Sequence, residues 1–173
     1  MQALVQSLIE WMTAAAEPWR NAWGESIVLS TGVLFVHLAA LVLGAGLALA
    51  ADRSTLRSWR SGPEERTRQL GELAATHRII QGALGALFGS GILLFLSDVE
   101  EYASSRVFWV KMGLVALLLA NGYAMTRTEA ALRGAGAQHP LIDRLWRRMR
   151  TRSVTSAALW LTTLLAGTIL ASR

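Results

Sequence analysis

The stretch IVLSTGVLFVHLAALVLGAGLALAA, from Ile27 to Ala51, decides the fold. It contains no Asp, Glu, Lys or Arg and lies between Glu25 and Asp52. A helix needs about 20 apolar residues to cross the hydrocarbon core of a bilayer, so this run is long enough to span a membrane. It holds one titratable side chain, His37. Polar groups at membrane depth usually face the protein interior or a cavity, which makes His37 the first candidate for a functional residue.

Three further apolar runs follow, and hydrophobic residues make up 53% of the chain. Long apolar runs of this kind are typical of membrane proteins. The sequence therefore predicts an all-α fold in which residues 25–173 form an antiparallel four-helix membrane bundle with short connections. The predicted spans cover residues 27–51, 79–96, 107–125 and 154–171.

Residues 1–24 are too polar to span a bilayer, but their apolar side chains recur at helical spacing. We expect an amphipathic helix that lies in the membrane interface on the outer face. Proline interrupts helices, so this helix is expected to end near Pro18. Three tryptophans suit the aromatic belt of an interface: Trp11, Trp19 and Trp23.

The basic residues set the expected orientation. Six arginines lie in residues 52–78 and seven in residues 127–152, whereas the other connections carry few. Lys and Arg are enriched in cytoplasmic loops, so both arginine-rich segments should be cytoplasmic and both termini outside. The same distribution explains the net charge of +5 without a nucleic-acid partner, and the lipid bilayer is the partner that it indicates.

Several chemistries are excluded by residue type or motif. The chain has no cysteine, so disulfides, thiolate metal sites and Cys nucleophiles are absent. It carries no HExxH, Walker, GxSxG or dinucleotide-binding motif. Glycines, by contrast, are frequent in the predicted spans, and small residues let membrane helices pack closely. We expect four of them to make helix contacts: Gly44, Gly82, Gly85 and Gly89.

Two polar clusters are expected at different depths. A helix rises about 1.5 Å per residue, which places His37 and Lys111 together in the outer half of the bilayer, below Glu25. A neutral imidazole can bind haem iron, or it can bond to a hydroxyl or carbonyl of a neighbouring helix. Both alternatives stay open for His37, and Lys111 is either a second cofactor-binding residue or a side chain that extends to the membrane surface.

The inner cluster lies at the cytoplasmic ends of the spans. Its members share that depth: Asp52, Arg53, His77, Arg78 and Asn121. By helix rise His77 lies about 20 Å below His37, too far for both to ligate one haem. Histidine is ordinary among interfacial charges, so we expect His77 to be structural.

Three stretches carry a resemblance to known families: VLFVHLAALVLGAGLALAADRSTLR (33–57), GSGILLFLSDVEEYASSRVFWVKMGLVALLLANGYAMTR (89–127) and SAALWLTTLLAGTIL (156–170). The chain resembles an uncharacterised bacterial family of small four-helix membrane proteins. That family is similar in style to CopD-like copper-resistance membrane proteins and to HemJ-type protoporphyrinogen oxidases.

The resemblance to the HemJ type implies a haem-associated protein of the bacterial inner membrane that uses a membrane histidine. It points to His37 as the metal ligand of haem b, and to Lys111 through the shared WVKMGL. Such a protein would transfer electrons or handle porphyrins. Two alternatives remain: a non-catalytic accessory or assembly subunit, acting as a homodimer or in a larger membrane complex, and a copper-handling CopD-like permease.

Overall fold

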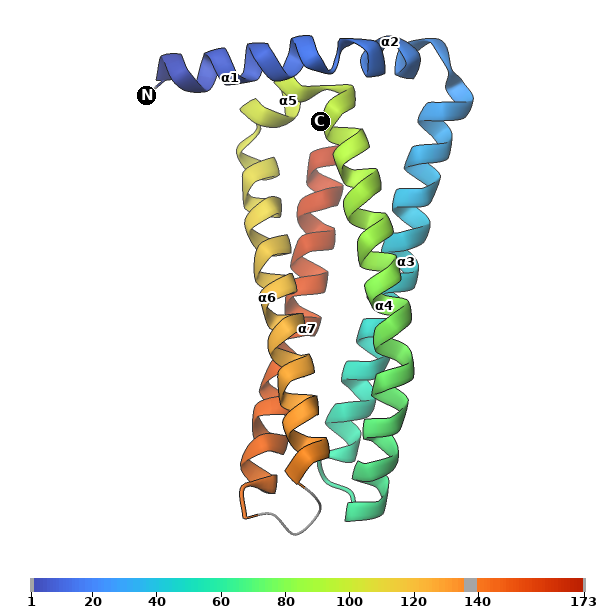
Figure 1. Cartoon of the computed structure of the whole chain (residues 1–173), viewed down its shortest axis with the longest axis vertical. Helices are drawn as coiled ribbons and strands as arrows, with labels where there is room; N and C mark the ends of the chain where they lie inside the picture. Colours follow the sequence, from blue (N-terminus) through green and yellow to red (C-terminus); the bar gives the residue numbers. More distant parts are fainter. Residues whose placement is uncertain (1, 136–139, 173) are drawn as a thin grey trace.

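The computed structural model describes residues 2–135 and 140–172, and in these ranges every regular element is an α-helix (Figure 1). Three are short: α1 (Gln2–Ala15), α2 (Glu17–Glu25) and α5 (Val99–Ser104). Four are long: α3 (Ile27–Ser58), α4 (Pro63–Ser97), α6 (Arg106–Ala135) and α7 (Ile142–Ala171). The long helices form a bundle, and each is long and apolar enough to cross a membrane.

The long helices continue beyond the predicted spans. They contain 30 to 35 residues, or about 45–52 Å of helix, against a hydrocarbon core of about 30 Å. Residues 52–78 contain the turn expected near Gly62, at residues 59–62, and a helix from Pro63 onward, but the helices on both sides of the turn are longer than expected. The Glu, Arg, Gln, Leu and Ala residues of this segment are good helix formers, and Pro63 occupies the first turn of α4, where proline is tolerated.

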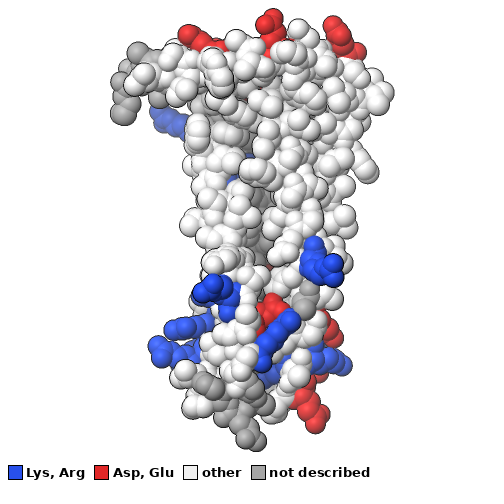
Figure 2. Space-filling view, viewed as in Figure 1, with Lys and Arg blue, Asp and Glu red and all other residues white. Residues whose placement is uncertain are grey.

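The bundle consists of two helix pairs. α3 packs along α4 and α6 packs along α7, and the pairs meet through α3 and α7. Two apolar clusters fill the interior: one holds Ala48, Ile80, Leu118 and Trp160, and a second, nearer the α3–α4 turn, holds Leu73, Met125, Leu132, Trp146 and Met149. α4 and α6 do not pack closely on each other, and the space-filling view shows the face between them hollowed (Figure 2).

The outside of the bundle is strongly apolar. Large hydrophobic side chains are exposed along the long helices, among them Phe35, Val42, Leu117 and Leu161. Soluble monomers rarely expose apolar surface on this scale, since it would contact water. The four apolar helices and their exposed faces suggest a multi-pass membrane protein.

The N-terminal segment lies across one end of the bundle as two helices, α1 and α2 (Figure 1). The first helix ends near Pro18, as expected, at Ala15, but a second helix that was not expected, α2, follows with Pro18 in its first turn. Proline fits there because the first helical N–H groups have no partner within the helix. Trp19 fastens α2 to the bundle, since its Nε1 donates to the Leu93 carbonyl oxygen at 2.9 Å.

Aromatic rings pack against one another at the same end of the bundle. Phe95 of α4 stacks on Phe108 of α6 with ring centroids 5.3 Å apart, and Tyr102 of α5 contacts both rings. Burial raises the pKa of the Tyr102 phenol, and the nearby Glu101 and Asp98 carboxylates raise it further. These contacts join the ends of α4 and α6, whose middle portions stay apart.

Only one of the four expected packing glycines makes a close helix contact. A Cβ at Gly44 would lie 3.3 Å from the Ala83 Cβ, so α3 and α4 approach closely there. A Cβ at Gly82, Gly85 or Gly89 would meet nothing within 4 Å. Their predicted contact within the chain is wrong, because these three glycines lie on the outer face of α4 while its opposite face packs on α3.

Candidate functional site

The ring of His37 is held against α4. Its Nδ1 lies 2.9 Å from Ser90 Oγ, and that hydroxyl donates its own proton to the Ala86 carbonyl oxygen at 2.6 Å. Ser90 Oγ therefore accepts from Nδ1, and the hydrogen-bond network assigns the Nδ1–H tautomer. The Leu87 carbonyl, a second acceptor on the same turn, also faces the ring. In this tautomer Nε2 keeps an unshared electron pair.

Gly91 makes room for this ring. A Cβ at Gly91 would lie 3.4 Å from His37 Cε1, in close contact with the ring. Ser90 and Gly91 thus act together, one residue orienting the imidazole and the next leaving space for it. Metal-ligating histidines usually have their second ring nitrogen fixed by such a partner.

Lys111 lies on the opposite side of the same region. Its Nζ would be 3.6 Å from a Cβ at Gly167, so the side chain lies over a bare stretch of α7 rather than along the outside of α6. The amine is close enough to His37 to act on it electrostatically. The structure thus brings together the two residues that helix rise places at one depth, whereas Glu25 is exposed at the end of α2.

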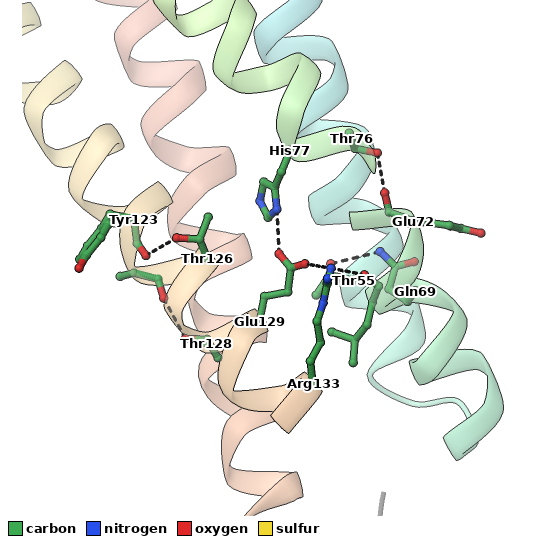
Figure 3. A network of polar contacts seen from close by, with 12 residues as sticks. Thr55, Gln69, Glu72, Thr76, His77, Tyr123, Thr126, Thr128, Glu129 and Arg133 are labelled. Atoms are coloured by element: carbon green, nitrogen blue, oxygen red, sulfur yellow. Dashed lines mark hydrogen bonds and ion pairs between the residues drawn. The ribbon is translucent and has the colours of Figure 1, made fainter. Parts of the chain in front are cut away.

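A second polar site lies nearer the α3–α4 turn (Figure 3). His77 Nδ1 is 2.7 Å from Glu129 Oε2, and Arg133 binds the other carboxylate oxygen of Glu129. Arg133 also donates to the Leu70 carbonyl oxygen at 2.8 Å, which links α6 to α4. His77 is therefore half of a pair with a buried carboxylate, not one of several solvated interfacial charges as expected.

The expected inner cluster is only partly assembled. Asp52 is 2% exposed and faces Ser153 and Ser156 of α7, with the His77 imidazole near enough to act on it electrostatically. Arg53 and Arg78 are exposed. Asn121 is also separate from Asp52, because its amide donates to the Arg152 carbonyl oxygen at 3.0 Å.

Two residues important to these sites were missed from the sequence, Ser90 and Glu129. Ser90 follows Gly89 and precedes Gly91, and we attributed the small residues there to packing. Glu129 was assigned to a connecting loop, although its spacing from Arg133 is the i, i+4 pattern of a helix. That spacing was the available signal that α6 extends past residue 125.

Among the side chains that the structure describes, no group of three or more His, Asp or Glu residues is arranged to hold a metal ion. Haem needs fewer protein ligands than a bare metal ion, since one imidazole is enough to ligate its iron. Comparisons with known protein families, with curated proteins and with solved structures found no match for this chain. The functional argument therefore depends on the chain's own residues.

Proposed function

We propose that this chain is a multi-pass protein of the bacterial inner membrane that binds haem b through Nε2 of His37. It is an antiparallel four-helix bundle with both termini outside, and α1 and α2 lie in the outer interface. The charge distribution supports this orientation, since Lys and Arg gather at the end that carries the α3–α4 turn (Figure 2). The haem serves electron transfer or porphyrin handling.

One observation carries the haem assignment: Ser90 and Gly91 present the His37 imidazole with Nδ1 occupied and Nε2 free. A neutral imidazole in this state has the donor chemistry of an axial iron ligand. The separation of α4 from α6 supports the proposal, because a porphyrin needs a flat, apolar space beside its ligand.

The surrounding residues would have distinct tasks. His37 would ligate the iron, Ser90 would hold the ring, and Lys111 would supply either a neutral amine as second ligand or a positive charge for a porphyrin carboxylate. His77 is not part of this site, because by helix rise it lies about 20 Å from His37 along the bundle. Haem bound here would supply one-electron redox chemistry.

The absorption spectrum of the detergent-purified protein tests the proposal. The protein, expressed with an adequate haem supply or incubated with hemin, is expected to show a Soret band that survives gel filtration. A colourless preparation that takes up no hemin would contradict haem binding.

The exposed glycines favour a second candidate function, that of a non-catalytic accessory subunit. Gly82, Gly85 and Gly89 form a surface on α4 that touches nothing in this chain, and such surfaces suit a second helix. Under this alternative Gly85→Leu lowers the particle mass in mild detergent, whereas Gly46→Leu, at another exposed glycine, does not. An unchanged mass in Gly85→Leu would count against it.

A further inference from the structure

The inner half contains a buried carboxyl group for which the haem proposal has no use. Asp52 is 2% exposed, and its Oδ2 is inaccessible to water and accepts no hydrogen bond from the described residues. The side chains that face it from α7 are two neutral hydroxyls, those of Ser153 and Ser156. Neutral hydroxyls do not balance a negative charge, so this buried carboxyl group is a candidate for binding a proton.

No fixed cation balances a negative charge on Asp52. Arg53 of the same helix and Arg78 of α4 are exposed, and Arg133 is bound to Glu129. Arg152 of α7 donates to the Ala124 carbonyl and the Thr128 hydroxyl of α6. An unpaired buried carboxylate costs several kcal/mol, and the simplest way to avoid this cost is to bind a proton.

A chain of titratable groups leads away from Asp52. The His77 imidazole of α4 is near enough to Asp52 to act on it electrostatically, and its Nδ1 lies 2.7 Å from Glu129 Oε2 of α6. Glu129 in turn binds Arg133, which lines a cavity on the side of the second apolar cluster, together with Leu70, Gly71 and Leu132. The path runs from a buried acid, through an imidazole and a carboxylate, to a cavity at the arginine-rich end.

We propose that Asp52 is a proton-binding site that exchanges its proton with the cytoplasmic side through His77 and Glu129. A proton leaving the Asp52 carboxyl is taken by the His77 imidazole. The imidazolium that forms lies between two carboxylates, those of Asp52 and Glu129, which stabilise its charge. Transfer of the Nδ1 proton to the Glu129 carboxylate restores the neutral ring, and Glu129 then releases the proton to water in the cavity. The site is independent of haem and operates in the protein with or without it.

Infrared difference spectroscopy of the purified protein tests the binding site. At pH 5 the wild type should show the carbonyl band of a protonated carboxyl, and Asp52→Asn should remove it. Asp143→Asn is the matched control, because Asp143 is 72% exposed and its loss should leave the band intact. A wild type without the band, or a band that persists in Asp52→Asn, would overturn the proposal.

Isotope labelling keeps the test valid if Asp52→Asn does not fold. The chain has three aspartates, Asp52, Asp98 and Asp143, and Asp52 is the most buried of them. Carboxyl-labelled aspartate should shift the band in the wild-type protein. A band that labelling leaves in place would belong to a glutamate and would refute the assignment.

The exchange path has its own readout. After a jump to alkaline pH, His77→Gln should lose the band at least tenfold more slowly than the wild type, whereas Arg53→Gln should match the wild type. Equal rates in all three proteins would exclude His77 as the carrier. Loss of the band on adding sodium at constant pH would show an alkali-cation site instead and would also overturn the proposal.

Discussion

The Nδ1 bond of His37 is the decisive contact at the scale of single residues. Because the Ser90 hydroxyl donates to the Ala86 carbonyl, we assign its oxygen as the acceptor of the ring's Nδ1–H, and this assignment leaves Nε2 free. A serine one helical turn from its acceptor carbonyl thus selects the tautomer of a histidine 53 positions away in sequence.

Removing the Ser90 hydroxyl should weaken haem binding without removing the ligand. Ser90→Ala is expected to lower hemin affinity about tenfold, since partners of metal-ligating histidines contribute at that scale. Hemin titration followed at the Soret band measures the effect. Ser97→Ala is the control, because Ser97 bonds only to the Leu94 carbonyl in its own helix. Identical affinities for wild type and Ser90→Ala would show that the tautomer plays no part.

The candidate site could be predicted from the sequence only in part. His37 and Lys111 stand out as titratable residues in apolar runs, and helix rise alone places them at one depth. Their orienting partners do not stand out, because serine and glycine are common in membrane helices. Which of them faces His37 depends on the rotation of α4 about its axis, and a chain with four apolar helices leaves that rotation open.

At the scale of helices, the spans were well predicted but their continuations were not. Hydropathy falls where α4 and α6 leave the apolar region, and the arginine-rich segments there resemble loops. They are helical because the Leu73, Leu132, Trp146 and Met149 side chains still share an apolar cluster. Packing among apolar residues spaced through a polar segment stabilises these helical extensions, and it also buries Glu129.

Two glycine substitutions should separate packed from exposed helix faces. Gly44→Leu is expected to destabilise the fold by about 1–3 kcal/mol, because even a Cβ there would press on Ala83. Gly85→Leu should be neutral or stabilising, since its face is open and leucine favours helix. Reversible unfolding in detergent measures both. A larger loss for Gly85→Leu than for Gly44→Leu would contradict the packing of α4 described above.

For the whole molecule, the two ends of the bundle differ in charge and in whether short helices cover them. One end carries α1, α2 and α5, and the other carries most of the arginines (Figures 1 and 2). If the arginine-rich end is cytoplasmic, the His37 site opens toward the outer half of the membrane and Asp52 lies near the inner boundary. Orientation thus determines which compartment each site communicates with.

Reporter fusions test this orientation. A fusion after Gly62, in the α3–α4 turn, should report a cytoplasmic location, and one after Glu101, in α5, should report an external one. Positive charge is the physical reason, since basic segments are retained on the cytoplasmic side. The reverse pattern would place the His37 site on the cytoplasmic side and Asp52 on the outer side, and it would refute the proposed topology.

Haem content of purified His37→Ala, beside His77→Ala as the matched control, tests the central claim most directly. Both substitutions remove one imidazole from one of the long helices, but only His37 is held against Ser90 and Gly91 at the depth of Lys111. We predict that His37→Ala loses its Soret band and its bound haem, while His77→Ala retains both. Full haem retention in His37→Ala, or equal loss in the two variants, would contradict haem ligation by His37.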